Sequence, residues 1–111
     1  MTESKIEKAV VKYVKSIGGE ALKLRIDGKN GFPDRTIKLP NGIEFLIEFK
    51  TQKGKLRSAQ KKWIKRLREL GGRVYIVDNV EDGEAIVWLE SIGKTSDAKA
   101  LGRSDKDCGL D

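Results

Sequence analysis

The chain has 111 residues and no histidine, and its 23 lysines and arginines outnumber its 17 aspartates and glutamates to give a net charge of +6. This length predicts a single domain. Without histidine, the chain cannot build histidine-dependent triads, histidine-metal nuclease sites or histidine-containing zinc sites, so any catalysis would depend on carboxylates, lysine and a hard cation. There is no apolar run long enough to span a membrane and no secretory signal pattern, which predicts a soluble, intracellular protein.

The positive charge is concentrated in the first 93 residues. From residue 94 onward, the charges cancel, with Lys94, Lys99, Arg103 and Lys106 against Asp97, Asp105, Asp107 and Asp111. The whole excess therefore belongs to residues 1–93 and suggests a polyanion as partner. Lysine-rich surfaces also serve solubility, so the charge alone does not decide between these roles.

A helix is predicted at the N-terminus. Ser4-Lys5-Ile6-Glu7 has the form of a capping box, with Ser4 as the N-cap and Glu7 three residues later. Apolar residues then recur at helical spacing until Gly18-Gly19 ends the run. The sequence leaves two roles open for Glu7: it closes the cap, or it contributes a third acid to a metal site.

A half-buried strand is predicted next, over residues 20–26, where Leu22, Leu24 and Ile26 alternate with basic side chains. Residues 27–33 follow as a loop marked by glycines and a proline. In this loop, Gly31 serves either turn geometry or the close approach of a phosphodiester to the backbone.

The rest of the chain is organised around a hairpin over residues 34–50. Odd positions from 43 to 49 are apolar, which predicts a strand with one apolar face and one chemical face. A two-residue Asn-Gly loop would mix polar and apolar faces across the hairpin. A three-residue loop, Pro40 to Gly42, instead places Ile37 opposite Phe45, so we expect this second register.

The expected register places two carboxylates, Asp34 and Glu48, directly opposite each other, with Cβ atoms on the order of 5 Å apart. Like charges at this spacing are destabilising unless a cation joins them, and such oxygen ligands suit Mg²⁺. Lys50 lies on the same face, roughly 7 Å further along the strand, where it would act as a point charge beside a phosphate or an attacking water. The alternative is that these are ordinary surface charges on an amphipathic hairpin.

A second helix is predicted from Ser58, its N-cap, to Leu70. Gln60 heads a stripe that is otherwise apolar, so its amide should bind either a group near the chemical face or the backbone; both remain open. The approach loop and the opposite side of this helix are strongly basic, as in a surface that binds the phosphate backbone without reading base sequence. The candidate DNA-binding residues are Lys53, Lys55, Arg57, Lys61, Lys62 and Lys65.

The last predicted elements are a short, nearly continuous apolar strand over residues 73–78, as expected of a central parallel strand, and, after Asn79, a helix that completes the core. Gly83 weakens the helix prediction, so an extended segment over residues 85–89 stays open. Residues 93–111 are polar and charge-balanced. They are expected to form a C-terminal tail after a domain that spans residues 1–92, held if at all by a neighbour.

With Gly31-Phe32-Pro33-Asp34, Glu48-Phe49-Lys50 and Gln60-Lys61-Lys62-Trp63 in order, the chain resembles the virus-type replication-repair nuclease (VRR-NUC) domain, a branch of the PD-(D/E)XK superfamily. The resemblance covers roughly residues 4–92. It implies an α/β fold of the restriction-endonuclease type, with a mixed central sheet flanked by helices.

The resemblance also implies a Mg²⁺- or Mn²⁺-dependent endonuclease that acts on DNA. Asp34, Glu48 and the backbone carbonyl of Phe49 would hold the metal, with Glu7 as a possible further ligand. Lys50 and Gln60 would complete the catalytic set. Small members of the family imply a homodimer that cuts branched DNA such as four-way junctions, in the cytoplasm of a bacterial or phage-infected cell.

Two other functions are compatible with the residues alone. A non-catalytic, basic DNA-binding module with a vestigial site would have lost one of the acids or Lys50, and the sequence retains all three. A basic adaptor for an acidic protein would respond neither to metal nor to DNA.

Overall fold

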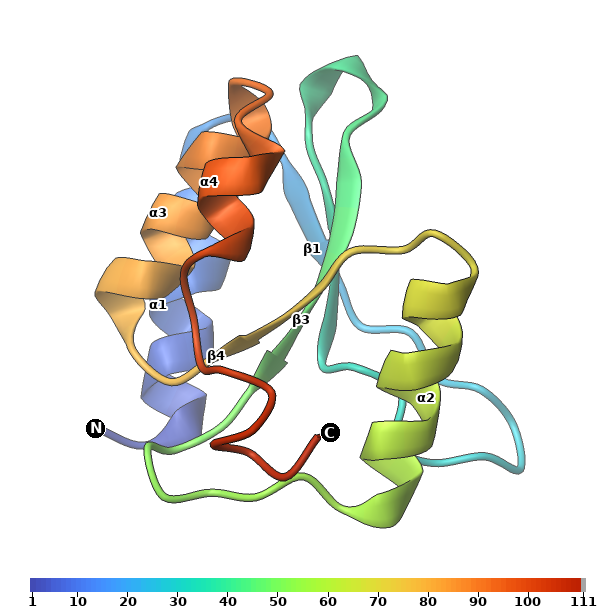
Figure 1. Cartoon of the computed structure of the whole chain (residues 1–111). Coiled ribbons are helices and arrows are strands. Elements are labelled where there is room, and N and C mark those ends of the chain that lie inside the picture. Colours follow the sequence, from blue (N-terminus) through green and yellow to red (C-terminus); the bar gives the residue numbers. More distant parts are fainter. Residues whose placement is uncertain (111) are drawn as a thin grey trace.

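The computed structural model describes residues 1–110, which form a four-stranded mixed sheet covered by helices on both faces (Figure 1). The strands, in their order across the sheet, are β1 (Glu20–Leu22), β2 (Arg35–Lys38), β3 (Glu44–Phe49) and β4 (Val74–Val77). The helices are α1 (Glu3–Ser16), α2 (Ser58–Glu69), α3 (Val80–Ser91) and α4 (Thr95–Lys99). The first three strands are antiparallel, and β4 runs parallel to β3, which confirms the predicted mixed α/β fold. The expected central position of β4 is wrong, because this strand lies at an edge of the sheet.

The two faces of β3 supply two separate cores. Phe45, Ile47 and Phe49 pack with apolar residues of α1 and α3, while Leu46 packs with Ile64 of α2 on the other face. The prediction of one apolar and one chemical face is therefore only half right, because α2 also covers the side that carries Glu48. Burial of both faces is what a strand flanked by helices on both sides requires.

The hairpin has the predicted three-residue register. Ile37 lies opposite Phe45, and the backbone N–H of Leu39 donates to the carbonyl of Ile43 at 2.8 Å. Between them, Pro40–Gly42 form a 3-10 turn in which Asn41 (φ +69°) and Gly42 (φ +77°) both adopt the left-handed conformation that turns the chain back. Asparagine and glycine are the residues that accept this conformation most readily.

The start of α1 differs from the prediction. Thr2, not Ser4, is the N-cap, and its side chain accepts a hydrogen bond from the N–H of Lys5 at 3.2 Å. The helix therefore begins two residues earlier than expected, and Glu7 lies beyond the third helical position, from which a capping box is closed.

The first strand is shorter than predicted and has the opposite face inward. Only residues 20–22 join the sheet, and Ala21, paired with Ile37, is the buried residue. Leu22, Leu24 and Ile26 are 38%, 47% and 38% exposed. The apolar alternation was misleading because apolar residues of α1 pack against Ala21, whereas Leu22, Leu24 and Ile26 stay outside the core.

The helices after β3 and β4 are confirmed, with one shift at a boundary. Arg57 rather than Ser58 is the N-cap of α2. The α3 helix includes Gly83, although glycine is unfavourable in a helix. A Cβ at this position would lie 2.5 Å from Cγ2 of Val10, so the glycine permits the close packing of α3 on α1.

The predicted C-terminal tail is instead packed on the body of the protein through residue 110. It contains α4, and its residues Ala98, Cys108 and Leu110 are at most 2% exposed. Cys108 and Leu110 complete the core under α2. These three buried residues help to anchor a segment whose overall composition is polar. Asp111 lies outside the described residues. None of the helices within residues 1–110 is long and apolar enough to cross a membrane.

Because Leu110 is buried, Leu110→Ala should lower the free energy of unfolding by about 2 kcal/mol or more, the usual cost of a cavity in a core. Leu70→Ala, at a residue that is 65% exposed, is the matched control and should change it by less than about 0.5 kcal/mol. Urea denaturation of both variants measures the difference. Equal stabilities would show that the segment does not contribute to the core.

Candidate active site

The register of the hairpin brings Asp34 and Glu48 to the same end of the sheet. Asp34 directly precedes β2, and Glu48 is the penultimate residue of β3. Since Arg35 pairs with Ile47, the preceding residue of β2 continues the register toward Glu48. Oδ2 of Asp34 accepts a hydrogen bond from the N–H of Phe49 at 2.8 Å, which fixes this carboxylate at the end of β3.

Glu48 is a buried carboxylate with too few partners. The residue is 2% exposed; Oε2 accepts a hydrogen bond from Nε2 of Gln60 at 3.0 Å, while Oε1 has no hydrogen-bond partner among the described residues. Burial, and then the nearby Asp34 carboxylate, raise the pKa of Glu48 from the ordinary 4.5 to about 8, although Lys50 acts in the opposite direction. The charged form of Glu48 is therefore poorly compensated by the described residues around it.

A second buried glutamate, Glu90, has hydrogen-bond donors for both of its carboxylate oxygens. Glu90, 1% exposed, accepts hydrogen bonds from Nε and Nη2 of Arg73 at 2.6 and 2.7 Å and from the hydroxyl of Tyr75 at 2.5 Å. This network stabilises the charge of Glu90 with a bidentate guanidinium. Glu48 has only a neutral amide and faces another acid, so the two buried glutamates serve different purposes.

Asp34 is less buried than Glu48, and its pKa is also raised. Burial is the main cause, and the carboxylates of Glu7 and Glu3 add to it. The N–H of Phe49 and the ammonium of Lys50 lower this pKa in part. Lys50 thus acts on both acids, and it is half-buried.

Glu7 neither closes the helix cap nor joins Asp34 and Glu48 in a cluster of three acids. Its Oε2 lies 2.6 Å from Nε of Arg35 and 3.8 Å from Nζ of Lys23. Within residues 1–110, there is no group of three or more acidic, cysteine or histidine side chains that could hold a metal ion. Arg35 was not singled out from the sequence, although it directly follows Asp34; it holds Glu7 and also donates to the carbonyl of Ala21 at 2.9 Å.

Gln60 fulfils both of the roles that the sequence left open. Its Nε2 donates to Glu48, and its Oε1 accepts from the backbone N–H of Arg57 at 2.8 Å. The same amide therefore supports the first turn of α2 and orients Glu48. Both oxygen and nitrogen of the side chain are used, which explains why a glutamine is buried in an otherwise apolar stripe.

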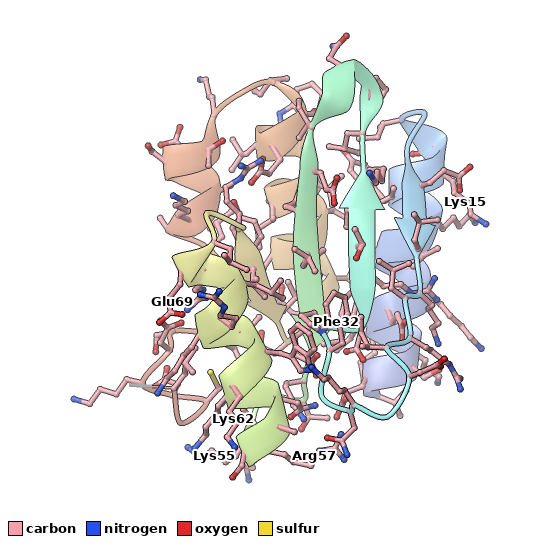
Figure 2. All side chains as sticks on the ribbon, turned by 90° about the vertical axis from the view of Figure 1, so that its right-hand side faces the viewer. Lys15, Phe32, Lys55, Arg57, Lys62 and Glu69 are labelled. Atoms are coloured by element: carbon pink, nitrogen blue, oxygen red, sulfur yellow. The ribbon has the colours of Figure 1, made fainter. Side chains whose placement is uncertain are left out.

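The loop that leads into Asp34 is fixed against the same turn of α2. Gly31 has φ +84°, and a Cβ there would lie 2.5 Å from the carbonyl carbon of Ala59. Phe32 packs edge-on against Trp63, with ring centroids 5.0 Å apart (Figure 2). The glycine thus serves a close approach of two backbones in addition to a turn, and both sides of the acid pair are held by α2.

The six candidate DNA-binding residues lie in the loop before α2 and in its first two turns. Figure 2 shows Lys55, Arg57 and Lys62 around the end of α2 at which the helix begins. None of the six forms an ion pair with an acid within residues 1–110, whereas Arg66 pairs with Glu69 and Arg68 with Asp105. Along this stretch, the cations without an acidic partner therefore surround the helix end that binds Glu48, and they end before Arg66.

This donor set fits a hard divalent cation. Two carboxylates at one end of a hairpin, one of which has a buried oxygen without a partner, provide the oxygen ligands that Mg²⁺ and Mn²⁺ prefer. Mg²⁺ usually keeps several waters and needs only one or two protein carboxylates, so a cluster of three acids is not required.

An aspartate before β2, Glu48-Phe49-Lys50 at the end of β3 and a mixed sheet between helices define a nuclease of the PD-(D/E)XK class. The model of the VRR-NUC domain matches residues 2–81, so the chain belongs to the VRR-NUC family. "Putative nuclease p44" of Acyrthosiphon pisum secondary endosymbiont phage 1 is 39% identical over 77 residues, which cover 69% of this chain and 83% of that protein. A solved "VRR_NUC domain" has the same fold, with a TM-score of 0.72 and 24% identity over 79% of this chain and 97% of that one.

The raised pKa of Glu48 predicts a measurable pH dependence of stability. A folded-state pKa of about 8 against an ordinary 4.5 means that this group contributes full stability below pH 4.5 and that its contribution falls as the pH rises toward 8. In EDTA, Glu48→Gln removes the charge and should therefore be more stable than the wild type at pH 8, by about 2–4 kcal/mol, and nearly equal at pH 5. Urea denaturation at both pH values measures this.

Glu44→Gln is the matched control, since Glu44 lies on the same strand but its side chain is 48% exposed and pairs with Lys38. This variant should stay within about 0.5 kcal/mol of the wild type at both pH values. A Glu48→Gln variant that is less stable than the wild type at pH 8 would show that the charge of Glu48 is already compensated within the chain.

Proposed function

We propose that this protein is a Mg²⁺- or Mn²⁺-dependent endodeoxyribonuclease in which Asp34 and Glu48 hold the metal. The observation that carries the proposal is the buried Glu48 carboxylate, which faces Asp34 and has one oxygen without a partner. The membership of the chain in the VRR-NUC family supports hydrolysis of a phosphodiester bond as the reaction. The alternative of a vestigial site is disfavoured. A non-catalytic module would gain stability by losing the buried charge of Glu48, whereas this chain has kept it.

In the proposed mechanism, the chain contributes position and charge. Asp34, Glu48 and the carbonyl of Phe49 provide the metal ligands, and the bound cation would polarise the scissile phosphate and activate water for in-line attack. Gln60 holds one oxygen of Glu48, which leaves the other oxygen for the cation. Lys50 stabilises the charge that develops on the phosphate. Glu7 would have to release Arg35 before it could act as a further ligand.

The free cations near the start of α2 support a DNA substrate. Lys53, Lys55, Arg57, Lys61, Lys62 and Lys65 are proposed to bind phosphates of the DNA backbone. Because such contacts are electrostatic, they provide affinity without base specificity. The N-terminal end of a helix adds a partial positive charge at the same place, which favours phosphate groups there.

The likeness to small VRR-NUC proteins leads us to propose a homodimer that cuts branched DNA such as four-way junctions, in a bacterial or phage-infected cell. Two copies related by a twofold axis would present two sites to two strands. The free edge of β1, with exposed Leu22, Leu24 and Ile26, supports self-association, since exposed apolar residues beside an unpaired strand favour contact with another chain.

The activity is tested with a panel of labelled linear duplex, flap, splayed-arm and four-way junction DNA, in Mg²⁺, Mn²⁺ or EDTA. We expect metal-dependent cleavage, fastest on the junction, and a loss of at least about 100-fold in Asp34→Asn and Glu48→Gln because a metal ligand is removed. Both variants should still bind DNA. Cleavage that persists in EDTA or in both variants would refute the mechanism, and light scattering on the same samples reports whether the protein is a dimer.

The binding surface is tested by comparing Lys62→Gln with Arg66→Gln, which remove one charge each from neighbouring turns of α2. Lys62 has no acidic partner within residues 1–110, whereas Arg66 pairs with Glu69. Losing a phosphate contact should reduce the slope of log affinity against log salt by about 1 in Lys62→Gln and hardly at all in Arg66→Gln. Fluorescence anisotropy at several salt concentrations measures the slopes; equal slopes would contradict the assigned surface.

A further inference from the structure

The loop between β3 and α2, residues 51–57, connects the acid pair to the DNA-binding surface. It follows Lys50, precedes the helix turn that holds Gln60, and carries three of the six candidate phosphate ligands: Lys53, Lys55 and Arg57. The loop contains one short turn, in which the N–H of Gly54 donates to the carbonyl of Thr51 at 3.0 Å. A loop with so little internal hydrogen bonding depends on other segments for a fixed shape.

The C-terminal segment provides these contacts, chiefly through Arg103. The side chain of Arg103 is only 6% exposed. Its Nη1 donates to the carbonyls of Thr51, at 2.8 Å, and of Gly54, and its Nη2 donates to the carbonyl of Asp107 at 2.8 Å. Among residues 1–110, the nearest acid is Asp78, 3.9 Å from Nε. The guanidinium is therefore used mainly to hold backbone carbonyls of the loop.

Arg103 is itself held in place, so it can act as a fixed anchor. Its backbone N–H donates to the carbonyl of Ile76 in β4 at 2.8 Å. The preceding Gly102, with φ +84°, approaches the same carbonyl so closely that a Cβ would lie 2.7 Å from the oxygen. The anchor thus extends from the central sheet, which also positions Glu48, to the loop.

Two further contacts join the same segments. The N–H of Leu56 donates to the carbonyl of Cys108 at 3.0 Å, and Nζ of Lys55 donates to the carbonyl of Asp107 at 2.7 Å. Figure 1 shows the C-terminal segment beside the loop that follows β3. An ammonium has three donors, so Lys55 retains donors for a phosphate while its position is fixed.

We infer that Arg103 is a positioning residue for substrate binding: it fixes residues 51–57 so that their cations meet the DNA backbone beside the acid pair. The inference rests on the proposed function, and it assigns a role to a segment beyond the stretch matched by the family model, residues 2–81. A fixed loop binds more tightly because less conformational entropy is lost on binding. Lysine cannot replace Arg103 here, since a single ammonium does not span three carbonyls in a planar fork.

The test uses the full chain with Arg103→Lys, which keeps the net charge, and Arg103→Met, which removes it. Lys106→Met is the matched control, because it removes one charge from an exposed residue of the same segment. The readouts are binding of a labelled linear duplex in EDTA, hydrogen exchange at the amides of Gly54 and Leu56, and the single-turnover cleavage rate in Mg²⁺ at saturating protein. All are measured below the melting temperature of each variant.

We expect Arg103→Lys to weaken duplex binding by about 3- to 10-fold and to accelerate exchange at both amides by about 10-fold or more, with the saturating cleavage rate within about twofold of the wild type. Lys106→Met should match the wild type in exchange. A purely stabilising role would lower the melting temperature and leave affinity unchanged. If Arg103→Met fails to fold, the charge-conserving Arg103→Lys still decides the question.

Unchanged affinity and exchange in Arg103→Lys would overturn the inference. This result is distinct from a failure of the proposed function, which would be a wild type that binds duplex but cleaves nothing in Mg²⁺ or Mn²⁺. In that case, the binding and exchange measurements in EDTA still decide whether Arg103 positions the loop. Weakened binding in Arg103→Met with an equal loss in Lys106→Met and wild-type binding in Arg103→Lys would also overturn the inference, because it would reflect charge rather than position.

Discussion

The structure depends on one unfavourable arrangement, the burial of Glu48 against Asp34. Placing a carboxylate where its oxygen has no partner costs stability, and a second acid beside it adds to the cost. The same protein does neutralise another buried glutamate: Glu90 of α3 is bound by Arg73 and Tyr75. This difference between the two glutamates is the physical basis of the metal site proposed for Glu48.

Several independent features keep this arrangement in place. The hairpin register sets the acids opposite each other, the N–H of Phe49 fixes Asp34, and Gln60 fixes one oxygen of Glu48. Gln60 also supports the first turn of α2, so the helix that carries the cations cannot shift without disturbing the acid. The position of Glu48 and the position of the cationic start of α2 therefore both depend on the side-chain amide of Gln60.

The sequence predicts the structure correctly where local chemistry decides the conformation of the chain. The turn of Pro40 to Gly42 and the alternation on both strands determine the register, and Gln60 stood out because it is polar in an apolar stripe. The prediction fails where distant contacts decide. Apolar Leu22 is exposed because α1 packs on the other face of its strand. A glycine stands at position 83 inside a helix because Val10 leaves no room for a side chain there. Glu7 pairs with Arg35, 28 residues away. None of these contacts leaves a periodic signal.

The C-terminal segment shows the same limit with a consequence for function. Its composition is that of a polar tail, yet Ala98, Cys108 and Leu110 bind it to the body, and Arg103 is the main contact that holds the loop after β3. The acids and Lys50 lie within the stretch that defines the family, whereas the contacts that shape the adjoining cationic loop come from beyond it. The shape of the cationic loop therefore depends on a segment that lies outside the stretch matched by the family model.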